Sequence, residues 1–341
     1  MMKHKLLFEL SKEHPTLPFS EIKACLTGEK KVFKIVDSDD AFLVVETSFS
    51  QNLIKNLEKR ISLSYFINEV TLVSPPSLKQ LLTIASYTNV DIQGSFRVRC
   101  KNHQKHKTVK STEVEQKLGE IYARVHPVNI KNPDTEIRVI LTQDKWYVCK
   151  KVVKIDRSAF EKRKVQHRPF FSPISLHPRL ARAMVNLSTI SAGETLLDPF
   201  CGTGGILLEA GLIGVKVIGG DVQQRMVEGC RKTLDTYHIK DYKLFTCDVG
   251  DIPFKTGLVD AVVTDFPYGR AATTNREKIT SLYERAFKTI HVVLKKGGRA
   301  VVTLPDKDAV KQGKKILNLE EVHSWRVHKS LTRYITVYYK K

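Results

Sequence analysis

TLLDPFCGTGG, residues 195–205, predicts a β-strand, a tight glycine turn and the start of a helix. β-favouring residues lead into an acid, a loop with three glycines follows, and helix-forming ILLEA comes next. In α/β proteins this arrangement cradles a nucleotide-like ligand. A dinucleotide fingerprint, GxGxxG, fits badly, because Gly202 and Gly204 fill its first two glycine positions but Leu207 stands at the third.

The acid of this stretch, Asp198, indicates the charge of the ligand. A carboxylate at the end of the strand would repel a pyrophosphate, yet it suits a ligand that carries a cationic amine or sulfonium. S-adenosylmethionine (SAM) is such a ligand. We therefore predict SAM as the co-substrate, with Asp198, Gly202 and Gly204 among its contacts.

Two further acids follow the next two predicted strands. Asp221 ends the run Val215–Gly220, where an acid can accept both ribose hydroxyls, and Asp248 follows Tyr242–Cys247, where it can receive an adenine amino group. Strands alternate with helices throughout this region, which predicts a doubly wound α/β sheet.

A second motif, Asp265-Phe266-Pro267-Tyr268, ends the apolar run 258–264. It resembles the Asp/Asn-Pro-Pro-Tyr signature of methyltransferases that act on exocyclic amino groups of bases, with Phe266 in place of the first proline. An aromatic amine is a poor nucleophile, because its lone pair is delocalised into the ring. A carboxylate that accepts its N–H, helped by a neighbouring backbone carbonyl, favours the pyramidal nitrogen that attacks a methyl group. Tyr268 can stack on the base.

Composition excludes several classes of protein. The 341 residues are 42% hydrophobic and 27% charged, as in globular chains of two to three domains. Apolar runs are too short for a membrane span, and the N-terminus fits neither a signal nor a transit peptide. The six cysteines are at least 17 positions apart, so we expect reduced thiols, no metal site and a cytoplasmic protein.

The net charge of +20 indicates a polyanionic partner. Residues 1–165 and 166–341 each carry ten more basic than acidic side chains, so the excess is spread over folded sequence. Alternation in residues 95–100 predicts a strand with two arginines on one face, and the basic stretch KNHQKHK (101–107) follows it. That stretch is either a solvated loop or a contact with phosphates. The predicted RNA contacts are Arg97, Arg99, Lys101, Lys105, Lys107 and Arg270.

Three local helix signals accompany these motifs. Thr112 and Glu115 have the spacing of a capping box, and Pro178 suits the first turn of a helix that reaches about Ile190. Lys295–Gly298 reads as a helix end, with cations in the last turn and glycine after it.

The middle of the chain resembles a THUMP domain. FRVRC (96–100), a helix containing Gly119 and NPDTEIRVIL (132–141) occur in that order. THUMP domains occur in RNA-modifying enzymes, so the resemblance implies binding to the acceptor end of tRNA.

The whole chain resembles the archaeal tRNA guanine-10 N2-methyltransferases. The matching segments, in order, are FFSPISLHPRLARAM (170–184), LLDPFCGTGGILLEAGLIG (196–214), GGDVQQRMVEG (219–229), VDAVVTDFPYGR (259–270) and KKGGRAVV (295–302). The resemblance implies a ferredoxin-like α+β module (1–60), a THUMP domain (61–153), a linker (154–167) and a Rossmann-like class I methyltransferase domain (168–341).

The family's function would be SAM-dependent methylation of N2 of guanosine 10 in tRNA, often to the dimethyl form. By position, Asp265, Phe266, Pro267 and Tyr268 match its catalytic motif, and Asp198, Phe200, Gly202, Gly204, Asp221 and Asp248 match its cofactor contacts. We expect a monomer, to which a small activator subunit could bind as in eukaryotic relatives. Two alternatives stay open: a THUMP methyltransferase for another guanine in the acceptor stem, and a catalytically silent tRNA-binding protein. An oxidoreductase would need the missing third glycine.

Overall fold

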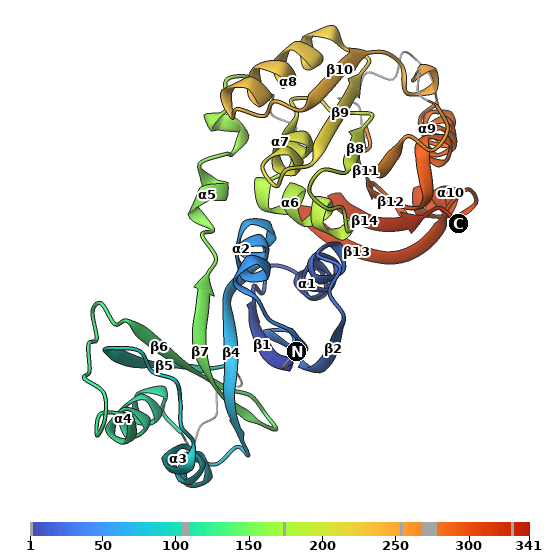
Figure 1. Cartoon of the computed structure of the whole chain (residues 1–341). Coiled ribbons are helices and arrows are strands. Elements are labelled where there is room, and N and C mark those ends of the chain that lie inside the picture. Colours follow the sequence, from blue (N-terminus) through green and yellow to red (C-terminus); the bar gives the residue numbers. More distant parts are fainter. Residues whose placement is uncertain (1–2, 104–108, 173–174, 253–254, 268–277, 329–330) are drawn as a thin grey trace. The chain divides into compact units, whose positions relative to one another are not determined.

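The computed structural model describes residues 3–103, 109–172, 175–252, 255–267, 278–328 and 331–341, and the chain divides into two compact units (Figure 1). The first unit comprises residues 1–12, 31–58 and 64–155, and the second comprises residues 13–30, 59–63 and 156–341. Each unit contains one seven-stranded sheet.

One continuous sheet runs through the first unit, in the order β2-β3-β1-β4-β7-β6-β5. Its β5–β6 pair is parallel and its other pairs are antiparallel. The elements are β1 (Lys3–Leu10), β2 (Phe33–Ser38), β3 (Phe42–Ser48), α2 (Gln51–Arg60, which reaches the boundary between the units), β4 (Ser64–Ser74), α3 (Leu78–Tyr87), β5 (Phe96–Asn102), α4 (Ser111–Tyr122), β6 (Thr135–Leu141) and β7 (Trp146–Lys154).

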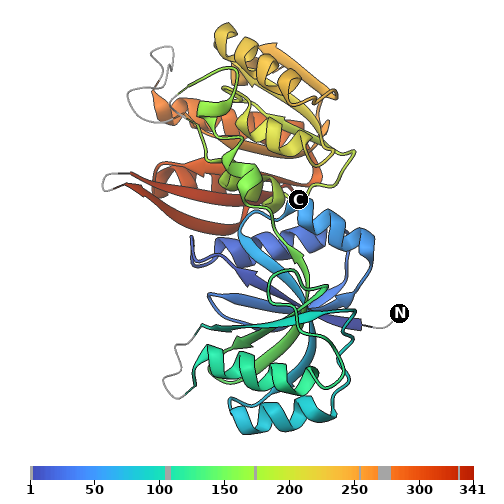
Figure 2. The ribbon, with the colours of Figure 1, turned by 90° about the vertical axis from the view of Figure 1, so that its left-hand side faces the viewer.

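The 11-residue strand β4 joins the two halves of this sheet, because it pairs with β1 along one edge and with β7 along the other. Strands from both sides of residue 60, where the sequence predicts a boundary between two modules, therefore belong to one sheet. Helices α3 and α4 lie side by side on one face (Figure 2), and their apolar residues pack on β5, β6 and β7.

The predicted capping box of α4 is wrong. Lys110 is the N-cap and makes no side-chain cap bond, so Thr112 lies inside the helix. Glu115 instead accepts a 2.8 Å hydrogen bond from the backbone N–H of Cys100 and contacts Arg99. The carboxylate binds the strand beside the helix rather than the helix's own first turn.

The predicted doubly wound α/β fold is confirmed in the second unit. The sheet order is β10-β9-β8-β11-β12-β14-β13, parallel except for β14, which is antiparallel to β12 and β13. The elements are α1 (Leu17–Gly28), α5 (Ser158–Glu161), η1 (Val165–His167), α6 (Pro178–Leu187), β8 (Thr195–Asp198), α7 (Gly205–Gly211), β9 (Lys216–Asp221), α8 (Gln224–Thr236), β10 (Tyr242–Thr246), η2 (Val249–Asp251), β11 (Val259–Asp265), α9 (Ile279–Val293), β12 (Leu294–Leu304), α10 (Lys307–Lys314), β13 (Asn318–His328) and β14 (Leu331–Tyr339).

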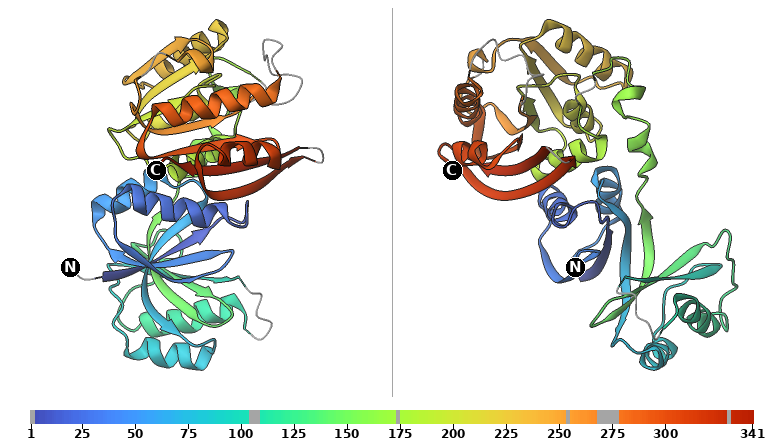
Figure 3. Two further views of the ribbon diagram at one scale, coloured as in Figure 1. Left: turned by 90° about the vertical axis from the view of Figure 1, so that its right-hand side faces the viewer. Right: turned by 180° about the vertical axis from the view of Figure 1, so that it is seen from behind.

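Both faces of this sheet are covered, as a mostly parallel sheet requires. Residues of α1, α6, α7 and α8 form one apolar cluster with alternate residues of the central strands. Residues of α9 and α10 form the other cluster, and Figure 3 shows these two helices on the same side of the sheet. Pro178 is the first residue of α6, as predicted, whereas α9 ends at Val293 and Lys295–Gly298 lie in β12 rather than closing the helix.

Helix α1 belongs to the second unit, although the 28 residues 31–58, which contain β2, β3 and most of α2, follow its segment before the next segment of that unit. Leu17 and Ala24 pack in the same cluster as Leu180 and Met184 of α6. The buried carboxylate of Glu21 accepts hydrogen bonds from both backbone N–H groups of residues 62 and 63 (3.0 and 2.8 Å) and from the side chain of Asn186 (2.9 Å). Burial raises the pKa of Glu21.

Candidate active site

Four acids meet at the carboxyl edge of the second sheet. Asp198, Asp221 and Asp265 are the last residues of β8, β9 and β11, and Asp248 follows β10 by two positions. These four strands are neighbours in the order β10-β9-β8-β11, and the chain reverses its direction across the sheet between β8 and β11. Ligands of open α/β sheets bind at such a switch point, outside the carboxyl ends of the strands.

The glycine turn after β8 is built for a close approach. Gly204 has φ +80°, and a Cβ there would lie 2.6 Å from Sγ of Cys230 on α8. Gly202 also has a positive φ, +49°, but a Cβ there would meet no described atom within 4 Å. Its N–H donates a 3.0 Å hydrogen bond to Oδ2 of Asp221, which ties the turn to the end of β9. The turn is therefore fixed in position, and no described side chain crowds Gly202.

Asp198 is buried, with an exposed fraction of 1%. Its Oδ1 accepts hydrogen bonds from the Thr264 hydroxyl (2.7 Å) and from the Phe200 N–H (3.1 Å). Burial raises its pKa to about 7, and the neighbouring charges of Asp265 and Asp221 act in the same direction. A cationic ligand at this edge would relieve that electrostatic penalty.

The other two predicted cofactor acids have different surroundings. Oδ1 of Asp221 accepts the N–H of Gln223 at 2.9 Å, and burial raises the pKa of Asp221. Asp248 accepts hydrogen bonds from the Arg285 guanidinium and from the Gly250 N–H (2.7 Å), and the bond from Arg285 lowers its pKa. Arg285 comes from α9, and we did not predict it from the sequence.

Asp265, the predicted catalytic acid, is held between two strands. The Thr303 hydroxyl on β12 donates a hydrogen bond to Oδ1, and Nη2 of Arg333 on β14 lies 3.8 Å from Oδ2. Burial raises the pKa of Asp265, and the Arg333 charge and the Thr303 bond oppose that rise. Neither partner was identifiable from sequence, because they lie 38 and 68 positions away with no spacing signal.

Phe266 is a core residue on the face of the sheet covered by α9. Its side chain is 1% exposed and lies 5.2 Å, between ring centroids, from each of Phe200, Tyr283 and Phe287. Its N–H, which the usual proline would lack, donates to the Thr303 carbonyl at 3.3 Å. The substitution is thus accommodated by an aromatic cluster and one additional backbone bond.

The next two residues of the motif lead away from the described part of the chain. The carbonyl of Pro267 accepts a 2.9 Å hydrogen bond from the Tyr283 hydroxyl. Tyr268 and Arg270 lie outside the described residues, so their predicted roles stay predictions. Predicted site residues described on this edge are Asp198, Phe200, Gly202, Gly204, Asp221, Asp248, Asp265, Phe266 and Pro267.

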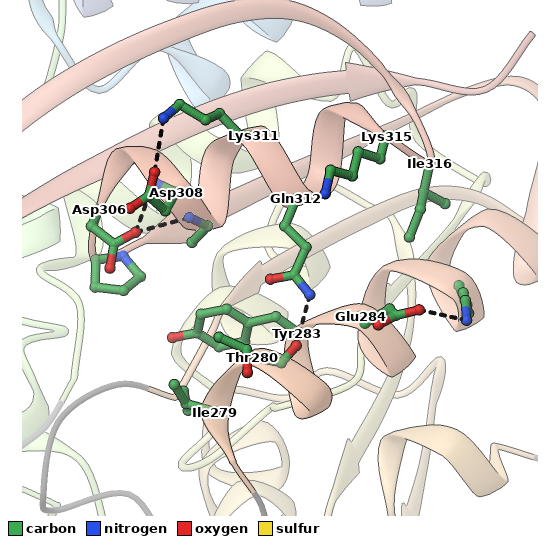
Figure 4. A pocket seen from close by; sticks show the side chains of 13 residues that line it. Ile279, Thr280, Tyr283, Glu284, Asp306, Asp308, Lys311, Gln312, Lys315 and Ile316 are labelled. Atoms are coloured by element: carbon green, nitrogen blue, oxygen red, sulfur yellow. Dashed lines mark hydrogen bonds and ion pairs between the residues drawn. The ribbon is translucent and has the colours of Figure 1, made fainter.

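A groove of about 890 Å³ lies between α9 and α10, beside this edge. Figure 4 shows Tyr283, Thr280 and Gln312 lining it, with Gln312 bonded to the Thr280 carbonyl. Its lining includes none of the four strand-end acids. Of the three lysines in its lining, Lys288 and Lys311 are paired with acids of the groove wall.

The predicted RNA contacts of β5 divide into two kinds. Arg97 donates to the buried carboxylate of Glu136 and to the Ile130 carbonyl, and Arg99 lies 3.5 Å from a carboxylate oxygen of Glu115. Lys101 is exposed on the same strand, β5, which is an edge strand of the first sheet. Lys105 and Lys107 lie outside the described residues.

The described residues contain neither a cluster of metal ligands nor a membrane-spanning helix. Among the described residues, no group of three or more His, Cys, Asp or Glu side chains could hold a metal ion, and all six cysteines are free. Within that same part of the chain, every helix is too short or too polar to cross a bilayer.

Comparisons with known proteins agree with this architecture. An RMKL-like methyltransferase domain model matches residues 165–335, and a THUMP domain model matches residues 79–150. The tRNA (guanine(10)-N2)-dimethyltransferase of Methanothermobacter thermautotrophicus is 35% identical over 98% of both chains. The enzyme of the same name from Methanocaldococcus jannaschii is 32% identical over 98% of this chain and 99% of its own. The crystal structure of TrmN from Thermus thermophilus matches 99% of this chain and 100% of its own with a TM-score of 0.58, at 20% identity.

Proposed function

The chain belongs to the THUMP-containing tRNA (guanine(10)-N2)-dimethyltransferase family, and from that premise we propose that it methylates the exocyclic N2 of guanosine 10 in tRNA. The products are N2-methyl- and N2,N2-dimethylguanosine. The observation that carries the proposal is the arrangement of four acids and a glycine turn at one sheet edge, with Asp265 beside Asp198.

SAM is the co-substrate in this proposal, and it supplies an electrophilic methyl group when bound. No described atom would lie within 4 Å of a Cβ at Gly202, which supports a close approach of the ligand there, and the buried Asp198 favours a positive charge next to it. Asp221 retains lone pairs for ribose hydroxyls beyond its two backbone bonds, since a carboxylate offers about four acceptor sites. Asp248, held by Arg285, lies one strand further along, where we place the adenine amino group. Phe200 packs beside Phe266 below the turn.

Asp265 activates the nucleophile. Its carboxylate accepts an N–H of the guanine amino group, and the Phe266 carbonyl assists, so the nitrogen becomes more pyramidal and its lone pair more available. Tyr268 stacks on the base. Guanosine 10 lies in a paired stem, so the base must leave the stack to reach the site, at about a few kcal/mol.

The basic charge of both parts of the chain favours tRNA as the polyanion. We place the phosphate contacts on Lys101, Lys105, Lys107 and Arg270. Arg97 and Arg99 lie on the same strand as Lys101, but their guanidinium groups contact Glu136 and Glu115. The enzyme acts as a monomer in the cytoplasm, where its substrate is, and sedimentation of the purified chain tests the first point.

The test is incubation of the full chain with tritiated SAM and tRNA transcripts, followed by nuclease digestion and mapping of the labelled nucleoside. We expect N2-methylated guanosine at position 10, and none in a transcript with adenosine there. Label at an acceptor-stem guanine would identify the alternative substrate site, and absence of label despite tRNA binding would identify a silent binding protein.

The variant that tests the role of the Asp265 charge is Asp265→Asn, because its amide keeps a hydrogen-bond acceptor and removes the charge. It should lower kcat by about 10²–10⁴-fold with SAM and tRNA binding retained, because the contact matters mainly in the transition state. Asp308→Asn, which removes an exposed carboxylate of α10, is the control and should turn over normally. Near-normal turnover of Asp265→Asn would refute the proposed role of the charge.

A further inference from the structure

Arg333 lies at the same edge of the sheet as Asp265, although it belongs to the antiparallel strand β14. Asp265 is opposite Thr303 in the β11–β12 pair, and Thr303 is opposite Ile335 in the β12–β14 pair. Because β14 is antiparallel, its first residues lie where β11 and β12 end. Side chains two positions apart share a face of a sheet, so Arg333 is on the same face as Ile335.

The pleat of the sheet places the side chains of Asp265, Thr303 and Arg333 on one face. Ile335 packs in the cluster that contains Val263 and Val301, which precede Asp265 and Thr303 by two positions. Asp265, Thr303 and Arg333 therefore project from three consecutive strands toward the same face. The order β11-β12-β14 can be followed in Figure 1.

Contacts to Asp265 involve both carboxylate oxygens. Thr303 donates to Oδ1, and Nη2 of Arg333 is 3.8 Å from Oδ2, with exposed fractions of 13% for the Arg333 side chain and 20% for that of Asp265. Among the described residues, Arg333 supplies the one basic group that lies within 4.0 Å of the Asp265 carboxylate. A charge pair this sheltered from water is screened much less than a pair on the surface.

Burial opposes ionisation of Asp265, whereas the charge of Arg333 and the hydrogen bond from Thr303 favour it. The buried carboxyl of Asp198 faces it from β8, and Thr303 on β12 is neutral. Of the two groups that lower the pKa of Asp265, the Arg333 charge has a larger effect than the Thr303 hydrogen bond.

We propose that Arg333 is a positioning residue for methyl transfer: its guanidinium pairs with Asp265 and, together with Thr303, fixes the carboxylate so that its remaining lone pairs point to the amino group of the base. This inference rests on the proposed function for the identity of the base. The anchoring of Asp265 does not depend on it.

Three variants in the full chain test the proposal. Arg333→Met removes the charge and keeps an apolar stem, and Arg333→Lys restores a charge without the planar fork. Arg326→Met is the matched control, because it removes an exposed arginine from the facing strand of the same β13–β14 hairpin. The first readout is kcat for tRNA methylation under saturating SAM, measured from pH 5.5 to 9.

We expect the acid limb of the Arg333→Met profile to move to higher pH by about one unit, since loss of a neighbouring cation raises the pKa of a carboxyl. KM for SAM should stay close to that of the wild type, Arg333→Lys should lie between the two, and Arg326→Met should superimpose on the wild type. A profile for Arg333→Met that superimposes on the wild type, or an equal shift in Arg326→Met, would overturn the proposal.

A second readout needs no tRNA. Carboxyl-labelled aspartate, with the Asp265 signal assigned from Asp265→Asn, reports the titration of Asp265 by NMR in each variant. The Asp265 signal should titrate at higher pH in Arg333→Met than in the wild type. An unchanged midpoint refutes the anchoring of Asp265 by Arg333, even if the chain methylates tRNA. If the wild-type chain methylates no tRNA, the proposed function is refuted, and this titration still decides whether Arg333 anchors Asp265.

Discussion

The Thr264 hydroxyl donates a 2.7 Å hydrogen bond to Oδ1 of Asp198. Thr264 immediately precedes the proposed catalytic acid Asp265, whereas Asp198 precedes the glycine turn, so this bond joins the proposed catalytic strand to the proposed cofactor strand. It also fixes two carboxyl groups close together, and the charge of Asp265 contributes to the raised pKa of Asp198.

Asp198 should make the stability of the ligand-free protein depend on pH. Its folded pKa of about 7 is above the ordinary value of 3.8, so the folded state binds the proton more tightly than the unfolded state. This contribution to the free energy of unfolding is therefore complete below about pH 4 and falls as the pH rises to about 7. Asp198→Asn keeps an acceptor for Thr264 and should flatten that part of the curve, by roughly 2–4 kcal/mol between pH 4 and 8. Urea unfolding at a series of pH values, with Asp308→Asn as control, measures the difference; equal slopes for wild type and Asp198→Asn would contradict the prediction.

Asp221→Ala should weaken SAM binding by roughly 1–3 kcal/mol, because ribose hydroxyls lose their acceptor. The Gly202 N–H also loses its 3.0 Å partner, so Asp221→Asn, which keeps one acceptor oxygen, should be affected less. Calorimetric titration with SAM measures both. Asp235→Ala, which removes an exposed acid at the far end of α8, is the control; affinity unchanged in Asp221→Ala would remove that residue from the site.

Phe266→Pro should destabilise the protein, although proline is the usual residue of the motif. The change removes a buried ring from contact with Phe200, Tyr283 and Phe287, and it removes the N–H that bonds to Thr303. Loss of such a ring costs about 3–5 kcal/mol. Phe266→Leu, which keeps apolar volume and the N–H, should cost less. Urea unfolding ranks the three proteins, and a Phe266→Pro variant as stable as the wild type would show that the cluster adds little.

Lys101 and Arg97 should respond differently to mutation, because Lys101 is exposed whereas the Arg97 guanidinium is bound to Glu136. Lys101→Ala should make tRNA binding less salt-dependent, lowering the slope of log K against log salt by roughly 0.7–0.9, with the melting temperature unchanged. Arg97→Ala should lower the melting temperature and leave the slope unchanged, since its guanidinium is bound to Glu136. Filter binding at several salt concentrations distinguishes them, and an equal loss of slope in Arg97→Ala would place Arg97 on the RNA.

Helix α1 should be required for a stable methyltransferase unit. A fragment of residues 166–341 lacks α1 and residues 59–63, so it exposes the apolar residues of α6 that Leu17 and Ala24 cover. Thermal unfolding should show a loss of cooperativity in that fragment.

Glu21→Ala in the full chain is the finer test of the same point. It leaves the N–H groups of residues 62 and 63 and the Asn186 amide without their acceptor, at about 1–3 kcal/mol for each buried donor. Glu228→Ala, an exposed acid of α8, should be close to the wild type. A cooperative fragment 166–341 and a stable Glu21→Ala variant together would show that α1 is dispensable.

The sequence by itself determined the class of the fold and the positions of the main acids. Each of Asp198, Asp221 and Asp265 ends an apolar run, and parallel strands bring such ends to one edge, so their proximity follows from local pattern and chain order. The glycine turn was equally predictable, because Gly204 occupies a conformation that other residues rarely adopt.

Only the tertiary structure decided which side chains hold those acids and which segments complete the unit. Thr303, Arg333 and Arg285 reach their carboxylates from other strands or from α9, and neither spacing nor periodicity encodes such contacts. Glu115 has the spacing of a capping residue, yet the neighbouring strand offers its carboxylate a backbone N–H, and that tertiary bond forms instead. Helix α1 precedes most strands of the first sheet in sequence but packs with α6, because the apolar face of α6 is where its own apolar residues are buried.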